Sequence, residues 1–332
     1  MDLDWLKVTP RGLYCVPGDF YIDPTSASAR AVVTHGHSDH ARAGHGTVLA
    51  TRETLAIMRL RMGDGAGSPD PVAYGERRDI GGVDLCLVPA GHILGSAQVV
   101  LEHGGKRVVV SGDYKRRADP TCPPFEPVPC DVFITEATFG LPVFRHPDDA
   151  GEIDKLLHSV ALFPERCHLV GVYALGKCQR VLALLRARGY DEPVFLHGAL
   201  AAMVALYESL GVAVGPVRAV TGVAREEFRG RIVLAPPSAA AEPWARRLPD
   251  PVVAMASGWM RVRQRAKQRG VELPLVISDH ADWDELLRTI GDTAPAEVWV
   301  THGAEDALVR QAGLMGFAAR PLSLAGFDAE EE

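Results

Sequence analysis

The fold of this chain is decided by residues 34–40, which read Thr34-His35-Gly36-His37-Ser38-Asp39-His40 and follow an apolar run at 31–33. The stretch places three imidazoles and one carboxylate within six positions. These groups hold catalytic zinc in proteins while leaving one coordination position open for water. Packing does not explain the cluster, because solvated polar groups gain little from being crowded together. The stretch therefore predicts a metal centre at the end of a strand.

Short apolar runs end in polar residues throughout the chain. The predicted strands are 31–34, 85–88, 108–110, 132–134, 168–172, 194–196, 232–234, 252–256, 274–278 and 297–301. A buried sheet whose strands deliver functional groups at their carboxyl ends has this pattern. Helices are predicted at 51–61, 148–163 and 177–188, the last ending at Gly189. Because strands and helices alternate, the fold class is α/β.

Composition describes an ordinary globular chain of 332 residues, with 47% hydrophobic and 23% charged residues. The net charge of −7 argues weakly against a protein that coats nucleic acid. No stretch approaches the roughly 20 apolar residues that span a bilayer, and the first residues do not form a signal peptide. We expect a cytoplasmic protein with no membrane partner. The six cysteines form no C-x-x-C pair, which argues against a disulfide framework and against a thiolate zinc site.

Two further candidate ligands follow predicted strands, His92 in Gly91-His-Ile-Leu-Gly95-Ser and Asp113 in Ser111-Gly-Asp-Tyr. Together with the H-x-H-x-D-H stretch, and in this order, they resemble the metallo-β-lactamase fold family. The resemblance implies an αββα sandwich that binds two Zn²⁺ ions, with Mn²⁺ as the alternative metal. It assigns His35, His37 and His92 to one ion, Asp39 and His40 to the other, and Asp113 to a bridge between them; Asp39 is also assigned a catalytic role.

The later part of the chain resembles the β-CASP branch of this family, in which a second α/β domain is inserted into the first. The matching positions are Glu136 in Ile134-Thr-Glu-Ala-Thr138, His280 in Ser278-Asp-His-Ala-Asp-Trp, and His302 in Val300-Thr-His-Gly-Ala. The resemblance implies that His302 is a further metal ligand. The predicted domains are 1–147 and 275–332 for the metallo-β-lactamase domain and 148–274 for the β-CASP insert.

Two stretches of the insert are candidate substrate-binding sites. In Tyr173-Ala-Leu-Gly176-Lys177, a glycine turn and a lysine open a helix, whose free N–H groups favour phosphate. A solvated lysine is the alternative, although the stretch also resembles one in DNA crosslink-repair nucleases. The second stretch, Ser257-Gly258-Trp259-Met260-Arg261, resembles the turn with which the β-CASP insert approaches the scissile phosphate. The basic residues that continue to Arg269 favour a solvated face, with Arg261 as the candidate phosphate contact.

The catalytic assignments complete the hypothesis. His280 is predicted to be the general acid that protonates the leaving oxygen, a role that histidine suits near pH 7. Glu136 is predicted to orient a ligand histidine or to hold the domain junction. Asp23 is assigned a similar supporting role, with Asp19 as the competing candidate.

The predicted function is that of a metal-dependent DNA exonuclease that acts in DNA repair, because the chain resembles the bacterial ligase-associated DNA exonucleases. Its expected partners are single-stranded DNA or a duplex end, with a functional association with a DNA ligase and a helicase. RNA 3′-end processing is the alternative, since His302 also resembles the RNA-processing members. A small-molecule ester or thioester hydrolase is a further alternative, which does not explain the insert. A catalytically silent binding subunit would be expected to lack ligand residues, whereas here every ligand position is filled.

Overall fold

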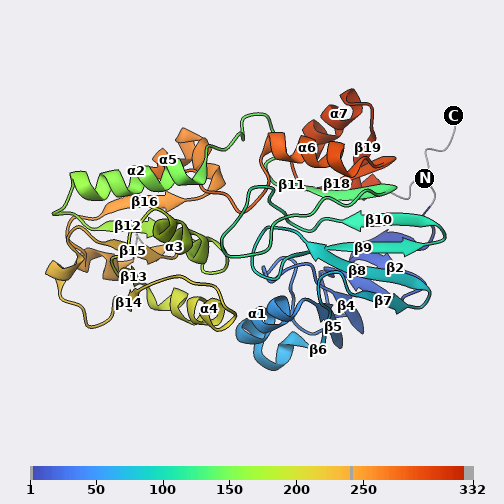
Figure 1. The fold of residues 1–332 in the computed structure, drawn as a ribbon, viewed down its shortest axis with the longest axis horizontal. Helices are drawn as coiled ribbons and strands as arrows, with labels where there is room; N and C mark the ends of the chain where they lie inside the picture. The colour runs from blue at the N-terminus through green and yellow to red at the C-terminus, as the bar shows by residue number, and fades with distance from the viewer. Residues whose placement is uncertain (1–2, 240–241, 325–332) are drawn as a thin grey trace. The chain divides into compact units, whose positions relative to one another are not determined.

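The computed structural model describes residues 3–239 and 242–324. The chain divides into two compact units, one formed by Val143–Asp279 and the other by the segments on either side of it (Figure 1). We call the first the inserted unit and the second the metal unit. The predicted domain boundaries at 147/148 and 274/275 stay a prediction.

The metal unit is built on two β-sheets. The first sheet runs in the order β1 (Leu6–Thr9), β2 (Gly12–Cys15), β3 (Phe20–Ile22), β4 (Arg30–Val32), β5 (Thr47–Ala50), β6 (Ser68–Pro71). The second runs in the order β19 (Ala318–Pro321), β18 (Glu297–Gly303), β11 (Val132–Ala137), β10 (Lys106–Val110), β9 (Ala97–His103), β8 (Val83–Pro89), β7 (Arg77–Ile80). Alternate residues of β8 are buried, as expected for a strand with one face in a core.

The layers of this unit follow from its three apolar clusters. One cluster joins Leu13 and Val32 of the first sheet to Leu87 and Ile134 of the second, so the sheets pack face to face. A second cluster packs α1 (Arg52–Met62) against the outer face of the first sheet. A third packs α6 (Trp283–Thr293) and α7 (Glu305–Leu314) against the outer face of the second. The predicted αββα sandwich is confirmed.

The inserted unit contains one parallel sheet, as expected for an α/β insert. Its strands lie in the order β14 (Val217–Ala219), β13 (Val194–Leu196), β15 (Ile232–Ala235), β12 (His168–Gly171), β16 (Val252–Ala256), β17 (Leu273–Leu275). The helices α2 (Asp149–Leu162), α3 (Lys177–Ala187) and α4 (Gly198–Ser209) pack against one face through a large apolar cluster. Short 3₁₀ segments, including η2 (Arg225–Phe228) and η4 (Pro243–Arg247), contribute to the cluster on the other face.

The strand predicted at 274–278 is wrong in its second half, because β17 ends at Leu275. Beyond it the chain leaves the sheet, since the Val276 amide donates to Glu152 Oε2 at 2.8 Å and the Ile277 amide to Leu275 O at 3.0 Å. A buried carboxylate thus replaces the neighbouring strand as acceptor. The predicted end of α3 is confirmed, with Gly189 at φ 79° directly after the helix cap.

No helix within residues 3–239 and 242–324 is both long enough and apolar enough to cross a membrane. All six cysteines are free thiols, and three of them are buried.

Candidate metal centre

The second sheet brings several candidate residues to one edge. Strands β10, β11 and β18 are parallel, and β8 points the same way because both β8 and β10 are antiparallel to β9. Three candidates lie near the carboxyl ends of such strands: His92 shortly after β8, Asp113 shortly after β10, and His302 next to the last residue of β18. The 34–40 stretch leaves β4 of the other sheet, and the Ala97 amide donates to Thr34 O at 2.8 Å. The carboxyl ends of strands from both sheets therefore meet at the centre.

Three histidines surround one oxygen of Asp113. His35 Nε2 lies 3.5 Å and His92 Nε2 lies 3.8 Å from Asp113 Oδ2. His37 Nδ1 lies 3.2 Å from His35 Nε2 and 3.0 Å from His92 Nε2. Each of the four residues offers a ligand atom, and these atoms all lie within 4.8 Å of one another. This group could hold one metal ion.

Two histidines lie at the other oxygen of the same carboxylate. His40 Nε2 is 3.5 Å and His302 Nδ1 is 3.8 Å from Asp113 Oδ1. These three residues form a second group whose ligand atoms lie within 4.8 Å of one another. Asp113 therefore presents one oxygen to each group, which is the arrangement of a carboxylate shared by two cations.

A β-bulge directs His302 to this position. Thr301 pairs with Glu136 and Gly303 with Ala137, which leaves His302 as the extra residue on β18. Its φ is +53°, a left-handed conformation that is uncommon outside glycine. Bulges of this kind re-aim a side chain and are frequent beside active sites. The added residue turns the His302 imidazole toward Asp113 Oδ1.

His40 is held by its own support. Its Nδ1 lies 2.7 Å from Asp23 Oδ2, and Asp23 also accepts from the Thr34 amide at 2.8 Å and the Thr34 hydroxyl at 2.6 Å. The other ring nitrogen, Nε2, is buried without a hydrogen-bond partner. A histidine fixed through one nitrogen with the other aimed into a cluster of donors is the usual form of a metal ligand. The residues present fit a bound metal ion.

Comparison with known proteins agrees with this geometry, although no family model matches the chain. The chain is 31% identical over 318 residues to a protein of Opitutus terrae named "Probable DNA ligase", covering 91% of this chain and 29% of that protein. It is 28% identical over 226 residues to Ribonuclease TTHA0252 of Thermus thermophilus, covering 58% of this chain and 51% of the relative. The chain is a relative of the β-CASP nucleases of the metallo-β-lactamase fold.

The other proteins similar to this chain match a shorter part of it or share only its fold. Identity to Cleavage and polyadenylation specificity factor 73 of Drosophila melanogaster is 33% over 122 residues, covering 35% of this chain and 17% of that protein. This chain thus spans between 17% and 51% of the length of these three curated relatives. A crystal structure of a protein of unknown function from Enterococcus faecalis matches with a TM-score of 0.58 and 14% identity, over 88% of this chain and 78% of that one.

Burial and neighbouring charges have opposite effects on the pKa values of the residues at the metal centre of this chain. Burial holds the pKa of His35 well below its usual range. Burial also disfavours charge on His40, but the carboxylates of Asp113 and Asp23 outweigh it and raise the His40 pKa to about 10. For Asp113, the cost of burial is outweighed by His40, His280 and His302, so its pKa lies well below the usual range. A metal ion that binds His40 must therefore displace a proton.

Glu136 and His280 form a third group with Asp113. His280 Nδ1 lies 3.0 Å and 3.1 Å from the two oxygens of Glu136, and 3.9 Å from Asp113 Oδ2. Glu136 is 1% exposed and also accepts from the Tyr114 amide at 2.7 Å. The carboxylate is thereby fixed by the backbone and in turn orients the His280 imidazole. Either a metal-binding or a proton-transfer role for His280 is compatible with this contact.

Asp39 is the predicted ligand that stands apart from these three groups. Its side chain is 69% exposed, and its Oδ2 lies 3.9 Å from His40 Nε2. Its predicted roles as a ligand and in catalysis stay predictions. Of the two aspartates considered for a supporting role at the metal centre, Asp23 contacts the ligand candidate His40. Asp19 instead accepts from the Tyr14 hydroxyl at 2.8 Å.

The predicted phosphate-binding residues lie in the inserted unit, in different surroundings. Lys177 begins α3 as predicted, but it is 3% exposed; its ammonium donates to Ile277 O at 2.7 Å and lies 3.0 Å from Asp279 Oδ1. Tyr173 is half exposed, and Gly176 has a φ of 83° at the helix start. Ser257 is buried, with its hydroxyl accepting from the Trp259 amide at 3.3 Å, Gly258 is buried, and Arg261 is exposed. Their substrate contacts stay predictions.

Sequence reasoning missed the part that Thr34 plays. Its amide and hydroxyl both donate to Asp23, and its hydroxyl lies 3.1 Å from His35 Nδ1, so it connects the support of two histidines. Its place at a strand end directly before the histidine stretch was the available signal. That signal is weak, because threonine is common at such ends for its strand propensity alone.

Proposed function

We propose that this chain is a metal-dependent phosphodiesterase that cleaves nucleic acid, with DNA as its favoured substrate and exonucleolytic DNA repair as its role. The single observation that carries the proposal is the sharing of Asp113. Its two oxygens face two separate histidine groups, one with His35, His37 and His92, the other with His40 and His302. Two cations held by one carboxylate suit phosphoryl transfer, in which both the attacking and the leaving oxygen need stabilisation.

We assign the ions as Zn²⁺, with Mn²⁺ as the alternative, because the donors are imidazoles and carboxylates without a thiolate. When bound, such ions supply a nucleophile near neutral pH and neutralise phosphoryl charge. Asp113 would contribute one oxygen to each metal site. Asp23, which accepts from the Thr34 hydroxyl, fixes the orientation of the His40 ring. Asp39 is retained as a ligand that turns inward on metal binding.

His280 is the proposed general acid. The Glu136 carboxylate holds Nδ1, which leaves Nε2 as the nitrogen that delivers a proton to the leaving oxygen. A buried carboxylate beside an imidazole stabilises the protonated ring that this step requires. Glu136 is therefore a positioning residue that acts through His280.

The preference for DNA is supported by the relative named "Probable DNA ligase", which is similar over 91% of this chain. The relatives named as ribonucleases match smaller parts of it. The first relative also supports a functional association with a DNA ligase; the association with a helicase stays a prediction. RNA cleavage, including 3′-end processing, is the second candidate, favoured by the names of the ribonuclease relatives.

End-labelled single-stranded DNA, duplex DNA and RNA of matched sequence provide the test. We expect DNA to be shortened from an end, the reaction to stop on addition of a chelator, and activity to return with Zn²⁺ or Mn²⁺. Metal analysis of the active protein should show about two ions per chain. Asp113→Asn should lose both activity and metal.

A chelator-sensitive reaction on RNA that exceeds the reaction on DNA would replace the first candidate by the second. Activity on DNA that survives exhaustive metal removal would contradict the whole proposal. Full activity of Asp113→Asn would do the same, since the shared carboxylate carries the assignment.

A further inference from the structure

The inserted unit has a charge balance opposite to that of the whole chain. Residues 143–279 contain 18 lysines and arginines against 14 aspartates and glutamates, a surplus of four positive charges, while the chain carries −7. Five of these cations lie within nine positions: Arg261, Arg263, Arg265, Lys267 and Arg269. Without them the unit would hold 13 cations and 14 carboxylates. The surplus of this unit therefore comes from one segment, which we call the 261–269 patch.

Several arginines of the inserted unit outside the 261–269 patch pair with a carboxylate, whereas the exposed Arg225, Arg246 and Arg247, like the patch, have no carboxylate ion pair among the described residues. Arg218, Arg229 and Arg231 each lie within 4.0 Å of a glutamate, as do Arg166 and, with an aspartate, Arg188. In the part of the chain that the structure describes, no carboxylate forms an ion pair with any of the five patch cations. Their charge is uncompensated by the protein.

Local structure keeps these side chains at the surface. The segment forms the turn η5 (Gly258–Arg261) and the short helix α5 (Arg263–Gln268) between β16 and β17. Within it, Met260 and Ala266 are the buried anchors, packed with Met255 and Val276. All five cations are exposed. A six-residue helix with one small buried side chain has little core of its own, so only Arg265 and Arg269 among the basic residues contribute to packing.

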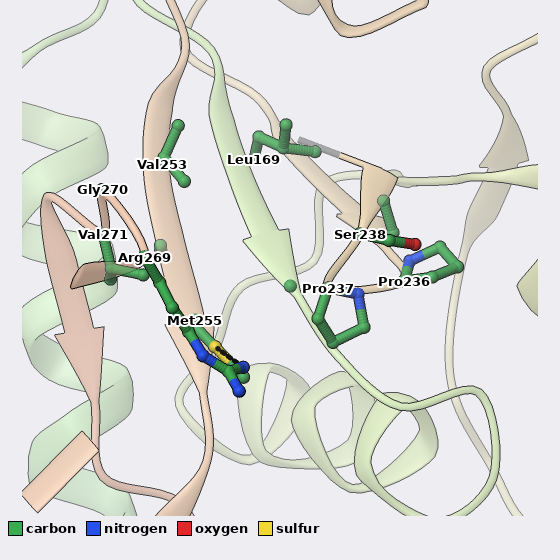
Figure 2. A pocket seen from close by; sticks show the side chains of 12 residues that line it. Leu169, Pro236, Pro237, Ser238, Val253, Met255, Arg269, Gly270 and Val271 are labelled. Carbon is green, nitrogen blue, oxygen red and sulfur yellow. Dashed lines mark hydrogen bonds between the residues drawn. The ribbon is translucent and has the colours of Figure 1, made fainter. Parts of the chain in front are cut away.

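An aromatic side chain and a pocket accompany the charges. The Arg265 guanidinium lies 4.0 Å above the centroid of Trp259. Arg269, the last cation of the patch, lines a pocket beside the carboxyl ends of β12, β15 and β16 (Figure 2). Its guanidinium lies 3.6 Å from Met255 Sδ. Arg265 and Arg269 are thus held in place by weak contacts, while Arg263 and Lys267 extend into solvent.

Resting on the proposed function, we infer that the 261–269 patch binds the phosphate backbone of the substrate strand. Rows of Lys and Arg without carboxylate partners attract a polyanion, and binding releases counterions from the strand. Because such contacts read phosphate and not bases, the patch binds a strand without sequence preference. The partner is a nucleic-acid strand that the patch binds through its phosphates. The five cations are exposed, as the predicted solvated face requires, and the inference assigns a ligand to that face.

Salt dependence of binding tests this directly. The probe is a fluorescein-labelled single-stranded DNA with a phosphorothioate backbone, which resists cleavage, so the metal-loaded protein can be titrated by anisotropy from 50 to 300 mM KCl. Each lost phosphate contact on a single strand lowers the slope of log K against log salt by about 0.7. We expect the triple variant R263Q/R265Q/K267Q to lower the magnitude of this slope by about 2. The single variants R263Q and K267Q should each lower it by about 0.7.

The matched control is R218Q/R229Q/R231Q, which removes the same charge from arginines that are paired with glutamates. Its slope should stay at the wild-type value. Equal slopes for the patch variant, its single variants and the control would overturn the inference. A second measurement uses phosphatidylserine vesicles. If the patch variant loses binding to these vesicles but keeps the wild-type slope on DNA, the inference is overturned as well. The proposed function fails independently, if wild-type protein binds the probe with the full slope and cleaves no unmodified DNA or RNA.

Discussion

His280→Ala removes the proposed general acid and separates proton transfer from metal binding. General acid catalysis contributes roughly 10²- to 10⁴-fold, so turnover of DNA should fall by that factor. The metal content should stay unchanged, since His35, His37 and His92 form one group and His40 and His302 another without it. Glu136→Gln keeps the shape but removes the charge that holds His280 Nδ1 at 3.0 Å. Loss of a charged hydrogen bond, about 1.5–3 kcal/mol, should lower turnover by roughly 10- to 150-fold.

The assay compares two substrates that differ in their leaving groups. In DNA the leaving oxygen is a poor leaving group that needs a proton, whereas p-nitrophenolate leaves readily as an anion. His280→Ala should therefore reduce hydrolysis of bis(p-nitrophenyl) phosphate far less than hydrolysis of DNA. A structural disturbance of the centre would reduce both alike. His103→Ala is the control, because His103 is a half-buried histidine of β9 that lies outside the three ligand groups, with its Nδ1 2.8 Å from Gly82 O.

Two results would refute the reasoning. Equal losses on both substrates would mean that His280 does not protonate the leaving group. Loss of a metal ion from His280→Ala would make His280 a ligand, as its group with Asp113 and Glu136 also permits.

Three further predictions follow from single contacts. Asp23→Asn should weaken metal affinity by about 10- to 100-fold, because Asp23 supports His40, whereas Asp19→Asn should not; equal metal titrations would contradict this. Gly303→Ala should prevent the bulge that presents His302, since its Cβ would lie 2.0 Å from Ala137 O, and thermal unfolding should show a large loss, against about 1 kcal/mol for the unobstructed Gly104→Ala. His168 is buried, and burial lowers its pKa to about 4, so as pH drops from about 6.5 toward 4 the unfolded chain is protonated first and the folded state loses stability. Between pH 7 and 5 the free energy of unfolding in urea should fall by up to about 2 kcal/mol more in the wild type than in His168→Gln. Identical losses in the two proteins would refute this prediction.

Much of the fold was predictable because its signals are local. The strands β8, β10, β11 and β13 and the helices α1 to α3 carry apolar patterns that match their structure. Strands β1, β2, β6 and β7 were not predicted. They are four residues long and several of their residues are charged, polar or proline, so propensity and periodicity are weak; pairing with neighbouring strands forms them. Similarly, β17 ends early because a distant carboxylate, Glu152, accepts the Val276 amide.

The sequence by itself determined which side chains are available for chemistry: a dense histidine stretch, and further histidines and carboxylates at strand ends. Those signals are local, because a strand end and a ligand type can be recognised within a few residues. Only the tertiary structure decided partners: that the two oxygens of Asp113 face different histidines, that Asp23 and not Asp19 supports His40, and that Lys177 is buried beside Asp279 while the 261–269 patch is not compensated. Partner choice depends on strand order, a bulge and burial, which arise from contacts between residues far apart in the chain.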